Sequence, residues 1–336
     1  MPVTLLPIKR AWACLKLMAL GIRVPNHELF KNREFITIEM QWSFRMINKP
    51  ENNMRQSWIK NDSLMDEKLK PVSDALFESI GTPKGRRFLD IGCGAGSTTV
   101  RLGRLISPTA SVTGIDISDS IITFAKQKAK GISNVDFVLG DAQTYEFKPN
   151  TFDGAMSRMG VMFFGDPIQA FSNIHGGLSE GAFLTFTCWA PPKEGELTDL
   201  LRRTALKHTG KTDNDLGPAT GGEAFIDKEY VKSILNDSGF SNLSIKTLMI
   251  HSRAKISPKE DAKLNMEIGC AQRIMIDAEA DDEIRERIYE DLLAISKEHQ
   301  EGDYVGYDRS IHILSLIHIS EPTRRTPISY AVFCLK

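Results

Sequence analysis

The chain has 336 residues, enough for one or two domains with a sizeable hydrophobic core. Its 42 basic and 43 acidic residues give a formal net charge of −1, so the composition indicates no nucleic-acid partner. The five cysteines lack metal-ligand spacing, which predicts no metal site and reduced thiols in a cytoplasmic protein. No apolar run reaches the ~18 residues of a transmembrane helix, and we expect no integral membrane segment.

The chain begins with an extension of doubtful origin, residues 1–45. Its apolar stretch at residues 5–20 carries three basic residues. It is either an amphipathic targeting or membrane-surface segment or the product of an upstream start codon, with the true start near Met46 or Met54. Apolar residues at helical spacing then predict one helix over residues 58–80.

The most informative motif follows a predicted strand at residues 87–91. The strand carries an acidic residue, Asp90, next to its end, and a helix is predicted from residue 98. A buried strand, a glycine-rich loop and a helix form the first turn of a Rossmann-like unit, where the backbone approaches a ligand closely. The loop consists of Gly92, Cys93, Gly94, Ala95 and Gly96.

The spacing of these glycines separates two classes of ligand. A dinucleotide-binding loop has the pattern G-x-G-x-x-G and holds a pyrophosphate, whereas Ser97 stands here in place of the third glycine. A carboxylate at Asp90 would repel a phosphate and attract an ammonium group. The pattern therefore favours a phosphate-free nucleoside bearing an amino acid, such as S-adenosylmethionine (SAM), and disfavours an NAD-dependent oxidoreductase.

Acidic residues also end the next two predicted strands. Asp116, followed by Ile117, comes directly after a predicted strand at residues 111–115. Its separation along the chain from Gly92 is close to the roughly 20 residues expected between a glycine loop and a ribose-binding acid. Asp141 and Ala142 follow a strand at residues 135–139 and could meet the adenine amino group and a ring nitrogen. Because ligands of open α/β sheets bind outside the carboxyl ends of the strands, we expect these residues to bind one cofactor.

Residues from about 54 to 250 resemble a class I SAM-dependent methyltransferase. Residues 89–96 resemble its first motif, residues 114–116 its ribose motif and residues 140–142 its adenine motif. Residues 157–167, at the end of a predicted fourth strand, resemble the ubiquinone/menaquinone-biosynthesis subgroup, which also carries a tryptophan and an acid ahead of the first strand. Trp58 and either Asp66 or Glu67 match those positions. The resemblance implies that Arg158 and Met159 face the reaction site and bind the cofactor. Alternatively, Arg158 neutralises an acidic acceptor or forms a surface ion pair, and Met159 packs in the core.

The implied fold is an α/β Rossmann-like methyltransferase fold. It has a mostly parallel seven-stranded sheet, helices on both faces and a helical insertion before the last strand. Within a methyltransferase domain at residues 46–313, the core covers about 54–251 and the insertion about 252–303. A capping box at Ser257 and Glu260 predicts the first insertion helix, and Asp119 and Asp227 are expected N-caps. Further strands are predicted at residues 152–157, 183–189, 243–251 and 303–313, and further helices at 98–105, 119–130, 167–178, 197–208, 228–238 and 281–297.

The end of the chain has an unusual sequence. Residues 314–324 and 328–335 match frame translations of transposase-type sequencing adapters, in the correct order and with a gap that fits an index. We therefore expect residues 314–336 to be adapter read-through. A natural hydrophobic tail is the alternative, and the source DNA would decide between them.

We predict a SAM-dependent methyltransferase that acts on a small-molecule acceptor by in-line displacement. Because the cofactor carries the activated group, catalysis depends mainly on positioning, and no catalytic residue can be named. His208 is a weak candidate for a base. A SAM-binding protein without activity, or an inactive truncated product, is the alternative. The acceptor, the methylated atom and the oligomeric state stay open.

Overall fold

The computed structural model describes residues 56–216 and 221–317, all of which belong to one compact unit, Met54–Lys336. The extension at residues 1–45 and all but four residues of the expected read-through lie outside this range. No helix in the described part of the chain is long and apolar enough to cross a membrane. The same residues contain no cluster of three or more metal-ligating side chains.

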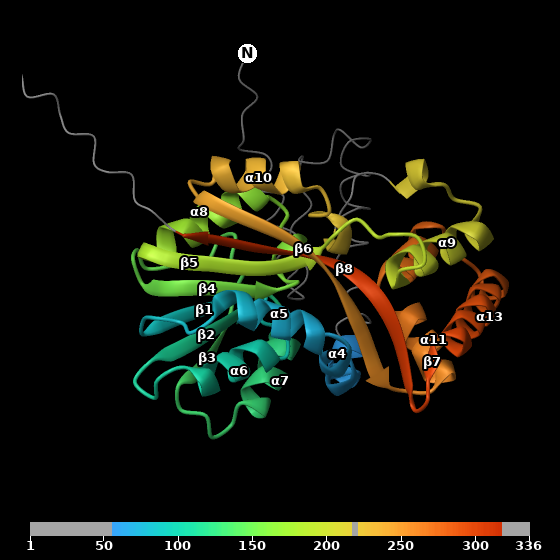
Figure 1. Cartoon of the computed structure of the whole chain (residues 1–336), viewed down its shortest axis with the longest axis horizontal. Helices are drawn as coiled ribbons and strands as arrows, with labels where there is room; N and C mark the ends of the chain where they lie inside the picture. The colour runs from blue at the N-terminus through green and yellow to red at the C-terminus, as the bar shows by residue number, and fades with distance from the viewer. Residues whose placement is uncertain (1–55, 217–220, 318–336) are drawn as a thin grey trace, which may run out of the picture. The chain divides into compact units, whose positions relative to one another are not determined.

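A single sheet organises the described residues (Figure 1). Its strands follow the order β3-β2-β1-β4-β5-β8-β6, and the short β7 pairs with β8. The first five strands are parallel, while β8 runs antiparallel between β5 and β6. This is the predicted mostly parallel, Rossmann-like α/β sheet, with a two-residue eighth strand added. The strands are β1 (Arg87–Ile91), β2 (Ser111–Asp116), β3 (Val135–Leu139), β4 (Phe152–Arg158), β5 (Leu178–Trp189), β6 (Ser241–Lys255), β7 (Gln300–Glu301) and β8 (Tyr304–Ile317).

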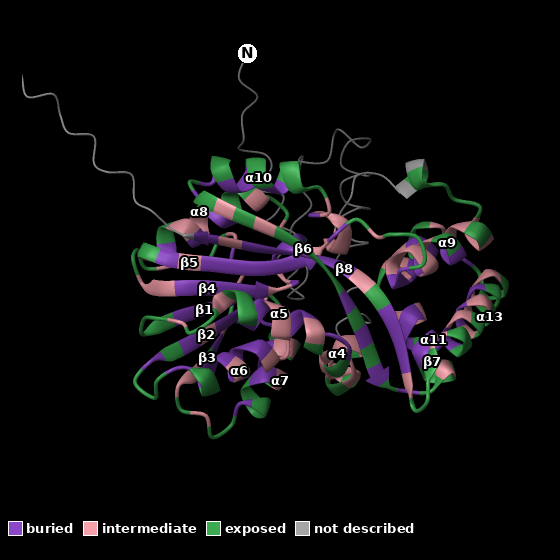
Figure 2. Cartoon of the chain, in the orientation of Figure 1, coloured by how far each residue is buried: buried purple, intermediate pink, exposed green. Residues whose placement is uncertain are grey.

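Helices cover the sheet, so its central strands are buried along their length (Figure 2). The flanking helices are α5 (Lys70–Ile80), α6 (Ser97–Leu105), α7 (Asp119–Lys128), α8 (Pro167–Gly177) and α10 (Lys228–Asp237). Asp227 caps α10 through the backbone N–H groups of residues 229 and 230, as predicted. The prediction for α7 was wrong: Ser118 is its N-cap, because the Ser118 carbonyl accepts the first helical hydrogen bond, from the N–H of Ile122, and Asp119 is its first helical residue.

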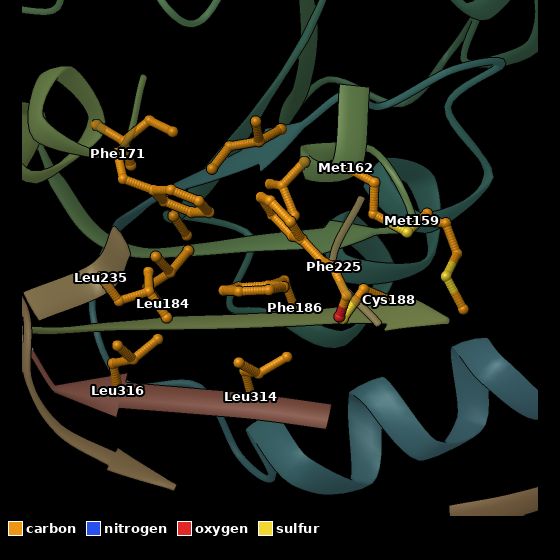
Figure 3. Close-up of a cluster of buried hydrophobic side chains, with 14 of the residues drawn as sticks. Met159, Met162, Phe171, Leu184, Phe186, Cys188, Phe225, Leu235, Leu314 and Leu316 are labelled. Atoms are coloured by element: carbon orange, nitrogen blue, oxygen red, sulfur yellow. The ribbon is translucent and has the colours of Figure 1, made fainter. Parts of the chain in front are cut away.

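The main core contains stacked aromatic rings on the side of the sheet covered by α8 and α10. The ring centre of Phe171 lies 5.6 Å from that of Phe186 and 6.1 Å from that of Phe225. Figure 3 shows these rings packed against Leu184 of β5, with Met159 and Met162 at one end of the cluster. The core therefore reaches the loop that follows β4.

The insertion is helical, as expected, and has its own core. It contains α11 (Pro258–Glu267), α12 (Cys270–Asp277) and α13 (Asp282–Glu298), which pack with α9 (Leu197–Thr209). Ser257 and Glu260 form the predicted capping box. The sequence did not predict α12, which begins directly after Gly269 (φ +110°).

The single helix predicted over residues 58–80 is divided in the structure. Residues 56–60 are helical, and α4 (Asp62–Lys68) and α5 follow after breaks at Asn61 and Leu69. Pro71 explains the second break, because its missing N–H and its ring are tolerated only in the first turn of a helix.

The last strand continues past the expected boundary at residue 314. Leu314 and Leu316 are buried and pair with β5, and Leu314 also pairs with β6. Their alternating apolar side chains suit a central strand, so residues 314–317 complete the sheet here. Whether residues 314–336 come from an adapter stays a prediction that the source DNA tests.

Candidate functional site

The glycine loop after β1 packs tightly at two glycines and is open at the third. All three have positive φ angles: Gly92 +61°, Gly94 +54° and Gly96 +82°. A Cβ at Gly92 would lie 2.8 Å from the Cα of Gly160, and one at Gly96 would lie 2.6 Å from the ring of Phe137. A Cβ at Gly94 would meet no atom within 4 Å. The loop is thus held from below and presents the Gly94 backbone to open space, where a ligand can approach.

Asp90 lies beneath this loop with no exposed surface. Thr98 and Thr99 donate their hydroxyl protons to Oδ2 at 2.8 Å and 2.7 Å. Oδ1 is buried and has no hydrogen-bond partner among the described residues. Burial raises the pKa of Asp90 to about 6, although the two threonines oppose this shift. An unsatisfied buried carboxylate oxygen suits a cationic group or a bridging water and disfavours a phosphate.

Asp116 ties the end of β2 to the glycine loop. Its Oδ2 accepts the N–H of Gly94 at 3.0 Å, and its Oδ1 accepts the N–H of Ser118 at 3.0 Å. Each carboxylate oxygen can accept a further hydrogen bond, so the half-buried side chain can also receive two hydroxyl groups. Next to it, Ile117 is 62% exposed and offers an apolar surface for the flat face of a base.

The turn after β3 lies beside Asp116, because the N–H of Gly140 donates to the Asp116 carbonyl at 3.0 Å. Asp141 Oδ1 accepts the N–H of Gln143 at 2.9 Å. The carbonyl of buried Ala142 accepts from the side-chain amide of Asn173 at 2.9 Å. The structure therefore brings the three predicted motifs to one edge of the sheet, with the second and third in direct contact.

Cys93 faces inward, while Ala95 is half-buried. The Cys93 side chain fills the space over Gly114, where a Cβ would lie 2.9 Å from its Sγ. Burial raises the pKa of the Cys93 thiol far above its ordinary value, so the thiolate does not form near neutral pH. Cys93 is therefore a packing residue of the loop.

Arg158, at the end of β4, contacts the segment ahead of the first strand. Its Nη1 donates to Asp66 Oδ1 at 2.8 Å and to Ser73 Oγ at 2.9 Å. Although burial raises the pKa of Asp66, Arg158 outweighs it together with neighbouring donors and lowers that pKa overall. The alternative residue, Glu67, accepts instead from the backbone of Lys255. Of the two acids, Asp66 is the one that contacts Arg158, which is therefore already paired.

The neighbouring residue Met159 has a left-handed backbone (φ +63°) and is 9% exposed. Its backbone N–H donates to the carbonyl of Thr187, which fixes the loop to β5. The loop continues to Phe163, whose side chain is 65% exposed. Trp58 is half-buried against the main core.

Sequence reasoning missed two parts of this region. Trp189 ends β5 and stacks under the guanidinium of Arg309, which belongs to β8. Lys68, in α4, forms a buried ion pair with Asp261 of the insertion. Neither pair has a local sequence signal, because each joins residues more than a hundred positions apart.

His208 does not face this edge of the sheet. It lies on α9, and its Nε2 is 2.7 Å from Oδ2 of Asp291 on α13. The weak base candidate is therefore engaged within the insertion.

Comparison with known proteins identifies the central region. Residues 83–239 match the family described as a methyltransferase domain. Demethylmenaquinone methyltransferases of Staphylococcus aureus (strains JH9 and Newman) are 31% identical to this chain over 124 residues, which is 37% of this chain and 52% of theirs. The chain thus spans about half the length of the curated relatives it matches.

Solved structures also resemble the chain. The YcgJ protein of Bacillus subtilis aligns with a TM-score of 0.48 and 15% identity, covering 74% of this chain and 98% of that one. Phosphoethanolamine N-methyltransferase 2 of Haemonchus contortus, in complex with SAM, aligns with a TM-score of 0.46 and 20% identity, covering 74% of this chain and 52% of that one.

Proposed function

We propose that this chain is a class I SAM-dependent methyltransferase that transfers the methyl group of SAM to a small-molecule acceptor. The observation that carries this proposal is the unpartnered Oδ1 of Asp90 beneath the open Gly94 backbone. A carboxylate at this position suits the ammonium group of SAM and disfavours the pyrophosphate of a dinucleotide.

The site residues fit the other parts of the cofactor. Asp116 has free acceptor capacity for the two ribose hydroxyls, and Ile117 offers an apolar surface for the adenine ring. Asp141 and Ala142, in the adjoining turn, are proposed to contact the adenine edge. When bound, SAM supplies a methyl group that its positive sulfur already activates.

The residues near the acceptor favour positioning as the source of catalysis. Met159 and Met162 are apolar and packed, and exposed Phe163 extends the same loop. These side chains can exclude water and align an apolar or aromatic acceptor with the methyl group. An acceptor that is already a good nucleophile needs no protein base.

The names of the relatives suggest one acceptor to test. The curated relatives are demethylmenaquinone methyltransferases, so a quinone precursor belongs in the acceptor screen. No described side chain by itself selects a quinone over another aromatic acceptor.

The test is calorimetric titration of the full chain with SAM, beside an Asp116→Ala variant. Loss of two hydrogen bonds to a charged acceptor should weaken binding by about 3 kcal/mol, or about a hundredfold. Asp119→Ala is the matched control, since Asp119 is exposed three residues further on, and it should bind SAM like the wild type. Transfer of a labelled methyl group to acceptor candidates then tests catalysis.

Two results would contradict the proposal. Binding of NADH in place of SAM would favour an oxidoreductase. SAM binding without transfer to any acceptor would favour the alternative of a non-catalytic SAM-binding protein.

A further inference from the structure

A second arginine lies at the carboxyl edge of the sheet, next to the end of β5. The guanidinium carbon of Arg309 is 3.6 Å from the centre of the Trp189 ring. Trp189 pairs with Ile311, and Arg309 lies two residues away from Ile311 along β8. Because residues two apart along a strand share a face, Arg309 and Trp189 belong to the same face of the sheet.

The end of β4 contributes to the same face. Arg158 pairs with Thr187, which is two residues before Trp189 on β5. One face of the sheet edge therefore carries two arginines, with Thr187 and Trp189 between them. Only one of these arginines has an acidic partner: Arg158 binds Asp66, whereas the described residues hold no carboxylate within ion-pair distance of Arg309.

Two buried polar atoms on this face lack partners. Neither Nε of Arg309 nor Oγ1 of Thr187 has a hydrogen bond to any described residue. The carboxylate of Glu196 accepts the N–H and hydroxyl of Ser310 at 2.8 Å and 2.5 Å, and its charge acts on Arg309 only from beyond ion-pair distance. Burial lowers the pKa of Arg309 to about 10, so the guanidinium stays charged at neutral pH. A half-buried cation with no anion in direct contact gains from a bound anion, which would stabilise it.

Apolar residues connect this arginine to the proposed acceptor region. The short helix η3 (Gly221–Glu223) lies close to the rings of both Phe163 and Trp189. A Cβ on Gly221 would be 3.4 Å from the ring of Phe163, and one on Gly222 would be 3.5 Å from the ring of Trp189. Phe163 thus lies in the short helix that follows β4, Trp189 at the end of β5 and Arg309 within β8, beyond the proposed cofactor loops of β1 to β3.

We propose that Arg309, stacked on Trp189, binds an anionic oxygen group of the methyl acceptor, so that the acceptor is an apolar or aromatic molecule carrying a carboxylate or a phosphate. This inference rests on the proposed function and names its substrate class. Stacking on the indole holds the guanidinium plane, while its N–H fork can grip two oxygens at once. Arg158 does not serve this purpose, because Asp66 already neutralises it.

The test uses the full chain saturated with S-adenosylhomocysteine and three probes of similar size: benzoate, phenyl phosphate and neutral benzyl alcohol. Calorimetry should show that at least one anion binds more tightly than benzyl alcohol, by about tenfold or more. Arg309→Gln should remove that preference, and Arg309→Lys should keep part of it. Arg253→Gln is the matched control, because Arg253 also stacks on an aromatic ring, Tyr304, but has a 58% exposed side chain.

The two anions distinguish the sources of the charge. A preference for benzoate assigns a carboxylate, and a preference for phenyl phosphate assigns a phosphate. The proposal is overturned if neither anion is preferred by the wild type, or if Arg309→Gln keeps the preference. If Arg309→Gln does not fold, Arg309→Lys is the test of the proposal. An anion preference as strong in Arg309→Lys as in the wild type would refute binding by the planar guanidinium of Arg309.

The cofactor titration separates this inference from the proposed function. If SAM and S-adenosylhomocysteine bind but no anion does, only the acceptor inference fails. If a folded chain binds neither cofactor form, the proposed function itself fails. Repeating the anion titration without cofactor then tests Arg309 independently.

Discussion

Replacing Asp90 by asparagine should stabilise the protein at high pH while weakening its hold on SAM. The asparagine side chain has the same shape, and Thr98 and Thr99 can still donate to its oxygen. The folded chain raises the pKa of Asp90 from 3.8 to about 6, chiefly by burial. That difference corresponds to about 3 kcal/mol, which the folded state loses when this carboxylate is ionised.

The sign of the effect follows from proton binding. Between these two pKa values the folded state holds the proton more tightly, so this group stabilises the fold as pH falls. Above pH 6 the group is ionised in both states, and the cost of its buried charge is complete. The stability gained by Asp90→Asn should therefore grow by about 1–2 kcal/mol between pH 5 and pH 8.

Urea unfolding of both proteins at the two pH values measures this change. Comparing two pH values removes any constant effect of the amide on packing. Asp237→Asn, which alters an exposed residue of α10, controls for the loss of one negative charge and should follow the wild type. A stability difference between Asp90→Asn and wild type that is the same at both pH values would refute the assignment of a costly buried charge.

The same variant links the charge to the cofactor. If ionised Asp90 binds the ammonium of SAM, wild-type affinity should fall as pH drops below about 6. Asp90→Asn should bind SAM about tenfold more weakly at pH 8 and show no such pH dependence. Equal binding by both proteins would show that Asp90 contributes only to the fold.

Two further predictions use matched pairs of residues. Gly94→Ala and Gly181→Ala each place a Cβ in an open position with a positive φ angle. Each should cost about 1 kcal/mol of stability, measured by thermal melting. Only Gly94→Ala should lose SAM binding, measured by calorimetry. Lys68→Met leaves the buried carboxylate of Asp261 without its cation and should lower the free energy of unfolding in urea by about 3–5 kcal/mol. Lys70→Met breaks an exposed ion pair and should lower it by less than about 1 kcal/mol. Similar results for the two members of either pair would contradict the structural reasoning.

The positions of the proposed cofactor residues could be predicted from the sequence because their signals are local. Strand β3 and the starts of β1, β2 and β4 agree with prediction, since a buried parallel strand is a short apolar run followed by glycine or an acid. The loop glycines, Asp116 and Asp141 each follow such a run directly. Their approach to one another then depends only on parallel pairing of neighbouring strands.

The acceptor half could not be predicted because its contacts join distant segments. Nothing near Arg309 in the sequence shows that it meets Trp189, since β8 reaches β5 only after the whole insertion. Periodicity also failed at helix ends. It predicted α4 and α5 as one helix, although Pro71 lies within that range, and it missed α12 altogether.

Helix α4 connects the two halves of the proposed site. Asp66 binds Arg158 beside the cofactor loops, while Asp62 binds Lys128 of α7. Lys68, two residues after Asp66, forms an ion pair with Asp261. Asp261 also accepts hydrogen bonds from Asn265 and Ser296 of the insertion and from Tyr307 of β8.

A helix of seven residues is not stable alone, so these contacts fix its position. The end of β4 and the helical insertion are therefore joined through α4. We expect Lys68→Met to reduce SAM affinity as well as stability, even though Lys68 lies outside the cofactor motifs. SAM titration of this variant under conditions where it remains folded tests that coupling, and unchanged affinity would show that the two halves are independent.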